Sequence, residues 1–188
     1  KYVMGFADRY LLFDQKNIPI VRNRLQIDED KISLVKDYDQ TGETVALLDV
    51  PRNQIELNAA LEKDYQQIYL RFLLDQLPVE QIPAKNYFGA VLKYIYSHPT
   101  LKPADYRTVA PYLGLDYDSV LFILRVFFEL GFVKLDEGKL VGEPSPKKQP
   151  LTASKYLMGT SSQIKFVNQL RTMPSQRLIT YINNLANN

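Results

Sequence analysis

The side chains that most often carry out catalysis are scarce in this chain of 188 residues. It contains a single histidine, His98, and no cysteine. Disulfides and thiolate metal sites are therefore excluded, as is any catalysis that needs two histidines. His98 follows an apolar helical pattern over residues 84–97. Because a charged imidazole is mildly favoured at the C-terminal end of a helix, we expect His98 to close that helix and not to catalyse.

Two acidic features resemble cation-binding positions. Asp49 lies near the end of the apolar run 45–50, as the magnesium-binding carboxylates of nucleotide hydrolases end a buried strand. However, the chain has no glycine-rich phosphate loop that finishes in Lys-Ser or Lys-Thr, so nucleotide hydrolysis is not supported. Asp28, Glu29 and Asp30 have the charge to hold a cation, but a solvated loop is the simpler interpretation. We predict neither a catalytic residue nor a metal site in this chain.

The basic residues are more informative than the acidic ones. The net charge is +2, but residues 1–77 carry a net charge of −3 and residues 78–188 a net charge of +5. No acidic residue follows Glu143, and a segment without carboxylates attracts polyanions such as phosphate backbones. A solubilising surface explains this basic tail equally well. The candidate DNA contacts are Lys134, Lys139, Lys147, Lys148, Lys155, Lys165, Arg171 and Arg177, with Tyr117 and Tyr156 available for base stacking.

The elements before residue 78 predict a small α/β domain. Apolar runs predict strands at residues 2–7, 32–35, 45–50 and 67–74, and helices are expected at 14–25 and 54–61, the second capped by Asn53. Strands of continuous apolar residues separated by helices indicate a mainly parallel sheet that is covered on both faces. We therefore expect residues 1–77 to form one α/β domain with about four strands.

The next segment, residues 78–143, predicts a winged-helix-like α+β unit. Pro78 and Pro83 mark its boundary, and a helix over residues 84–97 is followed by a second helix that begins at Pro103 and is disturbed at Pro111. A third, almost wholly apolar helix starts after Asp116 and ends at Gly131. A short hairpin with its bend at residues 136–138 completes the unit.

The start of the third helix does not favour sequence-specific reading of DNA. Recognition helices present Arg, Lys, Asn or Gln at this end, whereas here it carries Asp116, Tyr117 and Asp118, whose carboxylates repel phosphates. Arg125 is the only basic residue of the helix, and Glu129 one turn later can pair with it. We therefore interpret Asp116, Tyr117 and Asp118 as candidates for docking a protein partner.

The last segment, residues 144–188, predicts a basic linker followed by C-terminal helices. Three prolines stiffen residues 143–150, and caps are expected at Thr152 or Ser154, at Ser161 or Ser162, and at Ser175. We expect the helices to fold back on one of the domains. No run is long enough to span a membrane, and the absence of cysteine favours a cytoplasmic location. Because the chain begins at Lys1 without an initiator methionine, we expect it to be part of a longer protein.

Several strings resemble one known family. VFFELGFVKLDEG (126–138) and PKKQPLTASKYL (146–157) are similar to the C-terminal region of the Gram-positive type of RecJ, the single-strand-specific 5′-to-3′ DNA exonuclease. VALLDVPRN (45–53), QIYLRF (67–72) and AKNYFGAVLKYIY (84–96) resemble that region in the same order. The resemblance covers about residues 45–157, and none of these strings is a catalytic motif.

The resemblance implies an accessory role in DNA repair and recombination. RecJ enzymes hydrolyse DNA with Mn²⁺ or Mg²⁺ held by Asp and His clusters, and no such cluster can be matched to this sequence. The resemblance therefore implies a metal-dependent catalytic core elsewhere in the parent protein, and a chain that is itself non-catalytic and needs no cofactor. The expected partners are single-stranded DNA, bound without sequence preference, and the catalytic core in cis. The alternative is a protein-docking or architectural domain, for example for single-strand-binding protein, without direct DNA contact.

Overall fold

The computed structural model describes residues 6–74 and 77–186. The chain divides into two compact units, which we name by their main content. The sheet unit contains Lys1–Gln76 and Lys165–Asn188, and the helical unit contains Leu77–Ile164. The expected mixed α/β class is confirmed, with a four-stranded parallel sheet and seven α-helices in the described part of the chain. The expected division after residues 77 and 143 stays a prediction.

Within the described residues, the sheet has four parallel strands in the order β2-β1-β3-β4. They are β1 (Arg9–Leu12), β2 (Ile32–Leu34), β3 (Thr44–Asp49) and β4 (Gln67–Leu74). Leu11 of β1 pairs with Ser33 of β2 and with Leu47 of β3, so β1 and β3 occupy the centre. The expected strand at 2–7 lies mostly outside the described residues, and its described end, Phe6 and Ala7, is not in a strand. The first described strand is instead β1, which the sequence did not predict.

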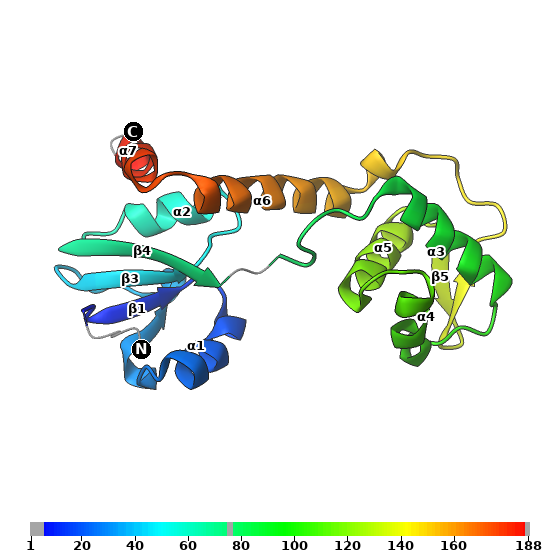
Figure 1. The fold of residues 1–188 in the computed structure, drawn as a ribbon, viewed down its shortest axis with the longest axis horizontal. Helices are drawn as coiled ribbons and strands as arrows, with labels where there is room; N and C mark the ends of the chain where they lie inside the picture. Colours follow the sequence, from blue (N-terminus) through cyan, green and yellow to red (C-terminus); the bar gives the residue numbers. More distant parts are fainter. Residues whose placement is uncertain (1–5, 75–76, 187–188) are drawn as a thin grey trace. The chain divides into compact units, whose positions relative to one another are not determined.

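Each face of this sheet is covered by one of the helices that connect its strands (Figure 1). On one face, Tyr10 and Leu12 pack with Val21 of α1 (Ile18–Leu25), which follows a 3-10 turn at Gln15–Asn17. On the other face, Leu11 and Leu47 pack with Ala60 of α2 (Gln54–Leu61). This alternation follows from the two-residue period of a strand. Short 3-10 turns at Glu29–Lys31 and Val35–Asp37 complete the connections.

The helical unit is organised around α5 (Tyr117–Glu129), which is buried on several sides. Phe122 and Phe127 of this helix meet Phe88 of α3 (Lys85–Ser97) edge to face, with ring centroids 6.5 and 6.0 Å apart. The other elements are a 3-10 turn at Pro103–Asp105, α4 (Tyr106–Tyr112), β5 (Val133–Asp136), β6 (Lys139–Gly142) and a 3-10 turn at Leu151–Ala153. As predicted, α4 contains the irregular Pro111 close to its end.

The two ends of α5 are set by residues that the sequence predicted. The Asp116 carboxylate accepts a hydrogen bond from the Ser119 backbone N–H at 2.7 Å and so caps the start. Gly131 has a φ of +66°, the left-handed conformation that ends a helix. The antiparallel β5–β6 hairpin then turns through Glu137 and Gly138, whose φ angles are both positive. Two positive φ angles are typical of the turn that matches the twist of a two-residue hairpin.

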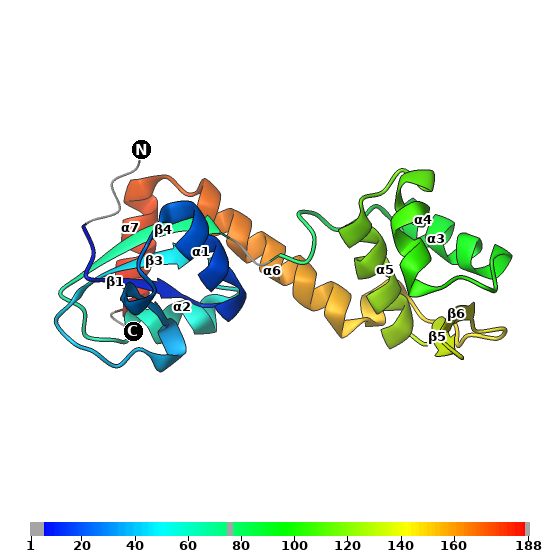
Figure 2. The same cartoon turned by 90° about the horizontal axis from the view of Figure 1, so that it is seen from below.

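Two helices end the described chain, α6 (Lys155–Thr172) and α7 (Ser175–Ala186). The expected new start at Ser161 or Ser162 is wrong because α6 runs through both residues. Thr160, Ile164 and Val167 are buried at helical spacing, so packing continues across the position where we expected a cap. In the sheet unit, α7 packs against α2 (Figures 1 and 2). Among the described residues, no helix combines the length and apolarity needed to cross a bilayer.

Candidate nucleic-acid interface

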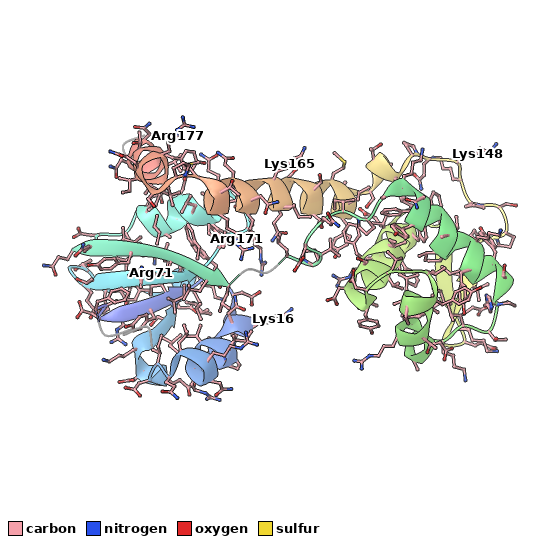
Figure 3. All side chains as sticks on the ribbon, viewed as in Figure 1. Lys16, Arg71, Lys148, Lys165, Arg171 and Arg177 are labelled. Atoms are coloured by element: carbon pink, nitrogen blue, oxygen red, sulfur yellow. The ribbon has the colours of Figure 1, made fainter. Side chains whose placement is uncertain are left out.

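The eight predicted DNA contacts are divided between the two units. Lys165, Arg171 and Arg177 belong to the sheet unit, and Lys134, Lys139, Lys147, Lys148 and Lys155 belong to the helical unit. All are exposed except Lys139, which is half-buried. Figure 3 shows the labelled side chains of Lys148, Lys165 and Arg177 extending outward from the ribbon. Each unit therefore presents its own set of cations to solvent.

The two hairpin lysines differ in their availability. Lys134 of β5 forms an ion pair with Glu143, with an N–O distance of 3.4 Å. Lys139 of β6 makes no ion pair with any residue that the structure describes. The same holds for Lys147 and Lys148, which lie in the proline-containing segment between β6 and α6. These three lysines are better placed than Lys134 to meet a phosphate.

In the sheet unit, Arg177 lines an open hollow of about 570 Å³ between the end of α6 and α7. Several lining residues carry polar side chains and one is aromatic, although apolar atoms make up most of the lining surface: beside the arginine lie Gln169, Thr172, Met173, Pro174, Thr180, Tyr181 and Asn184. Met173 and Pro174 interrupt the helical path here, which produces the bend and the hollow together. Arg177 thus stands next to amide and hydroxyl groups that can also bind phosphate oxygens.

The start of α6 in the helical unit is capped by two side chains. Ser154 accepts from the Leu157 backbone N–H at 3.0 Å, as its predicted capping role requires. The Glu129 carboxylate at the end of α5 accepts from the backbone N–H groups of Lys155 at 2.9 Å and Tyr156 at 3.1 Å, and from the Ser154 hydroxyl. The Ser154 hydrogen bond, followed by that of Tyr156, holds the pKa of Glu129 below its ordinary value.

Because Glu129 serves α6, the expected ion pair between Arg125 and Glu129 is not formed. The Arg125 guanidinium instead lies over the ring of Tyr156, 5.3 Å from the centroid, and its Nη1 donates a long hydrogen bond of 3.4 Å to the Tyr156 hydroxyl. Within the part of the chain that the structure describes, Arg125 has no carboxylate partner. This leaves an exposed cation whose position is fixed by an aromatic ring.

Arg125 and Tyr156 belong to a groove of about 410 Å³ on the helical unit. Asp118 lines the same groove two turns before Arg125, and the exposed ring of Phe128 contributes to its wall. The remaining lining residues are apolar or aromatic: Pro78, Tyr106, Leu121, Phe122 and Leu124. A mainly apolar hollow with a few polar groups is the usual composition of a ligand site. The Arg125–Tyr156 contact joins residues 31 positions apart, so no local spacing predicted it.

The three predicted docking residues do not share one environment. Asp116 is occupied by α5 capping, and hydrogen bonds from the side chain and backbone of Ser119 hold its pKa below the ordinary value. Tyr117 is half-buried, and the Arg107 guanidinium lies 5.3 Å from its ring centroid. Only Asp118 lines the groove. Asp116 and Asp118 are both exposed, so the acidic character of this end of α5 is retained.

One further cation was not among the residues predicted from the sequence. Arg71 of β4 lies over the rings of Phe6 and Tyr69, at 4.7 and 5.8 Å from their centroids. Tyr69 and Arg71 are two residues apart on one strand and therefore lie on the same face of it. The two-residue period of a strand could have predicted this pair from the sequence. The cluster is exposed at Arg71 and partly buried at the aromatic rings.

Asp49, the acidic residue at the end of β3, is fully buried. Its carboxylate accepts from the backbone N–H groups of Phe13 at 2.7 Å and Asp14 at 3.1 Å, and from the Asn17 side-chain amide at 2.9 Å. The carboxyl ends of central strands are where open α/β sheets usually bind ligands. Here that edge is held by these hydrogen bonds and by an ion pair of 2.8 Å between Asp14 and Arg52. Asp49 therefore joins β3 to the segment that follows β1.

His98 closes α3 as predicted. Its Nδ1 lies 2.8 Å from the carbonyl oxygen of Tyr94, and its ring stacks on the Tyr94 ring at 3.9 Å between centroids. Within residues 6–74 and 77–186, no three His, Asp or Glu side chains are grouped so that they could hold a metal ion. Asp28, Glu29 and Asp30 lie at an exposed turn, where Glu29 pairs with Arg22 at 3.0 Å.

Comparison with known proteins agrees with the resemblance found in the sequence. A family model described as the C-terminal domain of single-strand DNA-specific exonuclease matches residues 2–182. The single-stranded-DNA-specific exonuclease RecJ of Bacillus subtilis (strain 168) is 26% identical over 153 residues, which is 80% of this chain and 20% of the relative. The chain thus spans about a fifth of that relative's length. No solved structure matches. This chain belongs to the family of C-terminal domains of single-strand-DNA-specific exonucleases.

Proposed function

We propose that this chain is a non-catalytic accessory domain that helps a RecJ-like exonuclease hold single-stranded DNA without sequence preference. The observation that carries the proposal is the exposed basic surface after Glu143, where six lysines and arginines occur without one acidic residue. Phosphate neutralisation by such cations provides most of the affinity in non-specific DNA binding. The chain belongs to a family named for single-strand DNA exonucleases, which supports single-stranded DNA as the polyanion that it binds.

The proposed setting is DNA repair and recombination in the cytoplasm. The catalytic core, with Mn²⁺ or Mg²⁺ at its Asp and His clusters, lies in cis in the part of a RecJ-type protein that this chain does not span. Binding of DNA by the accessory domain then keeps the strand near that core after each cleavage. A tethered second binding site acts as a raised local concentration of the substrate.

We further propose that residues 78–143 act as a winged-helix-like scaffold. Three helices and a hairpin follow one another in the order of that motif. The backbone N–H of Leu140 in β6 donates to the carbonyl of Leu101 at 2.7 Å, which adds a third extended segment beside the hairpin. The acidic start of α5 favours a scaffold over a duplex reader, because Asp116 and Asp118 would face the phosphates.

A salt series measured by fluorescence anisotropy with a short single-stranded oligonucleotide tests the DNA-holding proposal. We expect binding that weakens steeply with salt, because each neutralised phosphate contributes a slope of about −0.7 in a plot of log affinity against log salt. The double variant Lys165→Gln with Arg177→Gln should lower the magnitude of that slope by about 0.7 for each phosphate that it no longer neutralises.

The matched control is the double variant Lys31→Gln with Lys36→Gln, which removes the same charge from exposed positions elsewhere in the sheet unit. It should change the slope much less. A flat titration at low salt removes the DNA-holding proposal. Equal slopes for the two double variants remove the assignment to Lys165 and Arg177.

The second candidate is a protein-docking domain, for example for single-strand-binding protein. It is favoured by the exposed acidic end of α5, where Asp116 and Asp118 flank the half-buried ring of Tyr117. This alternative predicts no oligonucleotide binding even at low salt. The same anisotropy titration therefore separates the two candidates.

A further inference from the structure

We infer that the groove on the helical unit binds one unstacked nucleotide of single-stranded DNA and prefers a base that carries an exocyclic amino group. The inference rests on the proposed DNA-holding function. It adds a binding site for a single base, which the exposed lysines of the basic surface do not provide. Three features of the groove carry it: a fixed cation, an exposed aromatic wall and a carboxylate acceptor.

The cation is Arg125, which remains available because Glu129 is committed elsewhere. The Glu129 carboxylate accepts hydrogen bonds from the first turn of α6, and Figure 2 shows the end of α5 beside the start of that helix. A guanidinium carries five N–H donors, and among the described residues Arg125 makes only the long hydrogen bond to Tyr156. Its remaining donors match the geometry of phosphate oxygens, and the interaction with Tyr156 holds the group in place.

The aromatic wall suits a flat ring. Phe128 is 38% exposed although α5 is otherwise largely buried, and it lines the groove with Tyr156. Phe122 supports Tyr156 from within, with ring centroids 5.3 Å apart. Bases that are free of a duplex stack on aromatic side chains and on guanidinium planes, with little regard to sequence. The groove volume of about 410 Å³ is at the size of ordinary small-ligand sites.

The carboxylate is Asp118, which faces the same groove from the other end. Asp118 and Arg125 are seven residues apart on one helix, so they lie on nearly the same side and about 10 Å apart along its axis. A single nucleotide spans a comparable length from its phosphate to the edge of its base. With the phosphate at Arg125, the base edge meets Asp118.

A carboxylate can only accept hydrogen bonds at neutral pH, so it selects donors on that edge. Cytosine presents its N4 amino group, and aspartate accepts from this group in other protein–DNA complexes. Uracil presents a carbonyl oxygen at the same position, which a carboxylate repels. The charge pattern of the groove therefore fits a nucleotide bearing an amino group better than it fits uracil or thymine.

The test compares oligo-deoxycytidine with oligo-deoxyuridine of equal length, measured by anisotropy at one salt concentration on the whole chain. We expect the cytidine strand to bind at least about threefold more tightly, somewhat less than a good bidentate pair provides. Asp118→Asn should abolish this preference, because an amide both donates and accepts. Arg125→Gln and Phe128→Ser should weaken the binding of both strands and leave their ratio nearly unchanged.

The control is Asp136→Asn, which removes an exposed carboxylate from the hairpin of the same unit, outside the groove. It should leave the cytidine-to-uridine ratio unaltered. Thermal unfolding of each variant verifies that it is folded, and the three groove positions are all exposed in the structure.

Three results overturn the inference. The first is equal binding of the two strands by the unmodified chain, and the second is a preference that survives Asp118→Asn. The third is unaltered affinity after both Arg125→Gln and Phe128→Ser, which would leave the groove to a protein partner. If oligonucleotide binding in these cases still depends on salt, the proposed DNA-holding function of the exposed basic surface after Glu143 is still supported. An absence of oligonucleotide binding at low salt removes that proposed function as well.

Discussion

At the residue scale, two carboxylates that each accept several hydrogen bonds serve the architecture of the molecule. Asp49 joins the end of β3 to the segment after β1, and Glu129 joins the end of α5 to the start of α6. Both accept hydrogen bonds from backbone N–H groups, which would otherwise stay unpaired. An acidic residue at a strand end is thus a poor indicator of a metal site when the segment after the neighbouring strand has donors to satisfy.

Replacement of Asp49 by alanine should destabilise the sheet unit strongly. The backbone N–H groups of Phe13 and Asp14 and the amide of Asn17 would lose their buried acceptor, at a cost of about 3 kcal/mol or more in the free energy of unfolding. Urea denaturation measures this change. Asp37→Ala, which removes an exposed carboxylate of the same unit, is the control and should have little effect. Equal unfolding midpoints for the two variants would contradict the structural role of Asp49.

Glu129 should give the helical unit a pH-dependent contribution to stability. Its folded-state pKa lies below the ordinary value of 4.5, chiefly through the hydrogen bond from Ser154. The stabilisation is therefore complete above about pH 4.5 and is lost as the pH falls through the folded-state value. Glu129→Gln should increase amide hydrogen exchange at Lys155 and Tyr156 at neutral pH, and its difference from the unmodified chain should shrink in acid. The control Glu80→Gln alters an exposed acid, and an identical profile for the two variants would argue against this cap.

At the element scale, sequence patterns predicted most helices and strands because local rules agreed with tertiary packing. Asn53 caps α2, Asp116 caps α5 and Gly131 ends it, all as the residue types indicated. The sequence did not predict β1. Its apolar run at residues 10–13 is short and follows the charged Asp8 and Arg9, and the apolar run at residues 2–7 is longer and predicts the first strand instead. Thus β1 owes its central place to pairing with β2 and β3, which no local pattern contains.

Two interactions at the candidate interface show where sequence reasoning stops. A spacing of four residues on one helix predicted a pair between Arg125 and Glu129. The structure replaces it with interactions with residues 154–156, because the start of α6 offers Glu129 several donors and offers Arg125 an aromatic ring. The composition of the sequence was enough to predict the positive charge of the basic tail. The groove that links Asp118, Arg125 and Tyr156 was not, since it depends on packing between α5 and α6.

At the scale of the whole molecule, the sheet unit is closed by residues that are distant in sequence. Residues 165–188 belong with Lys1–Gln76, although the entire helical unit intervenes along the chain. Val167 and Leu170 of α6 and Ile182 of α7 are buried there. The same segment carries Lys165, Arg171 and Arg177, so one stretch supplies both apolar cover and basic surface. This arrangement ties the proposed DNA-binding residues to the integrity of the sheet unit.

Ile182 and Ile179 offer a matched test of that arrangement on one helix. Ile182 is buried at 6% exposure, whereas Ile179 is 58% exposed. Ile182→Ala should lower the free energy of unfolding of the sheet unit by about 2–4 kcal/mol, and Ile179→Ala should change it far less. Hydrogen exchange should show the loss of protection first in α2, which packs against α7, while amides of α5 in the helical unit keep theirs. Similar effects of the two variants, or a loss confined to the helical unit, would mean that α7 does not cover the sheet unit.

Because α7 also carries Arg177, Ile182→Ala should weaken oligonucleotide binding in parallel with the fraction of molecules in which α7 is detached.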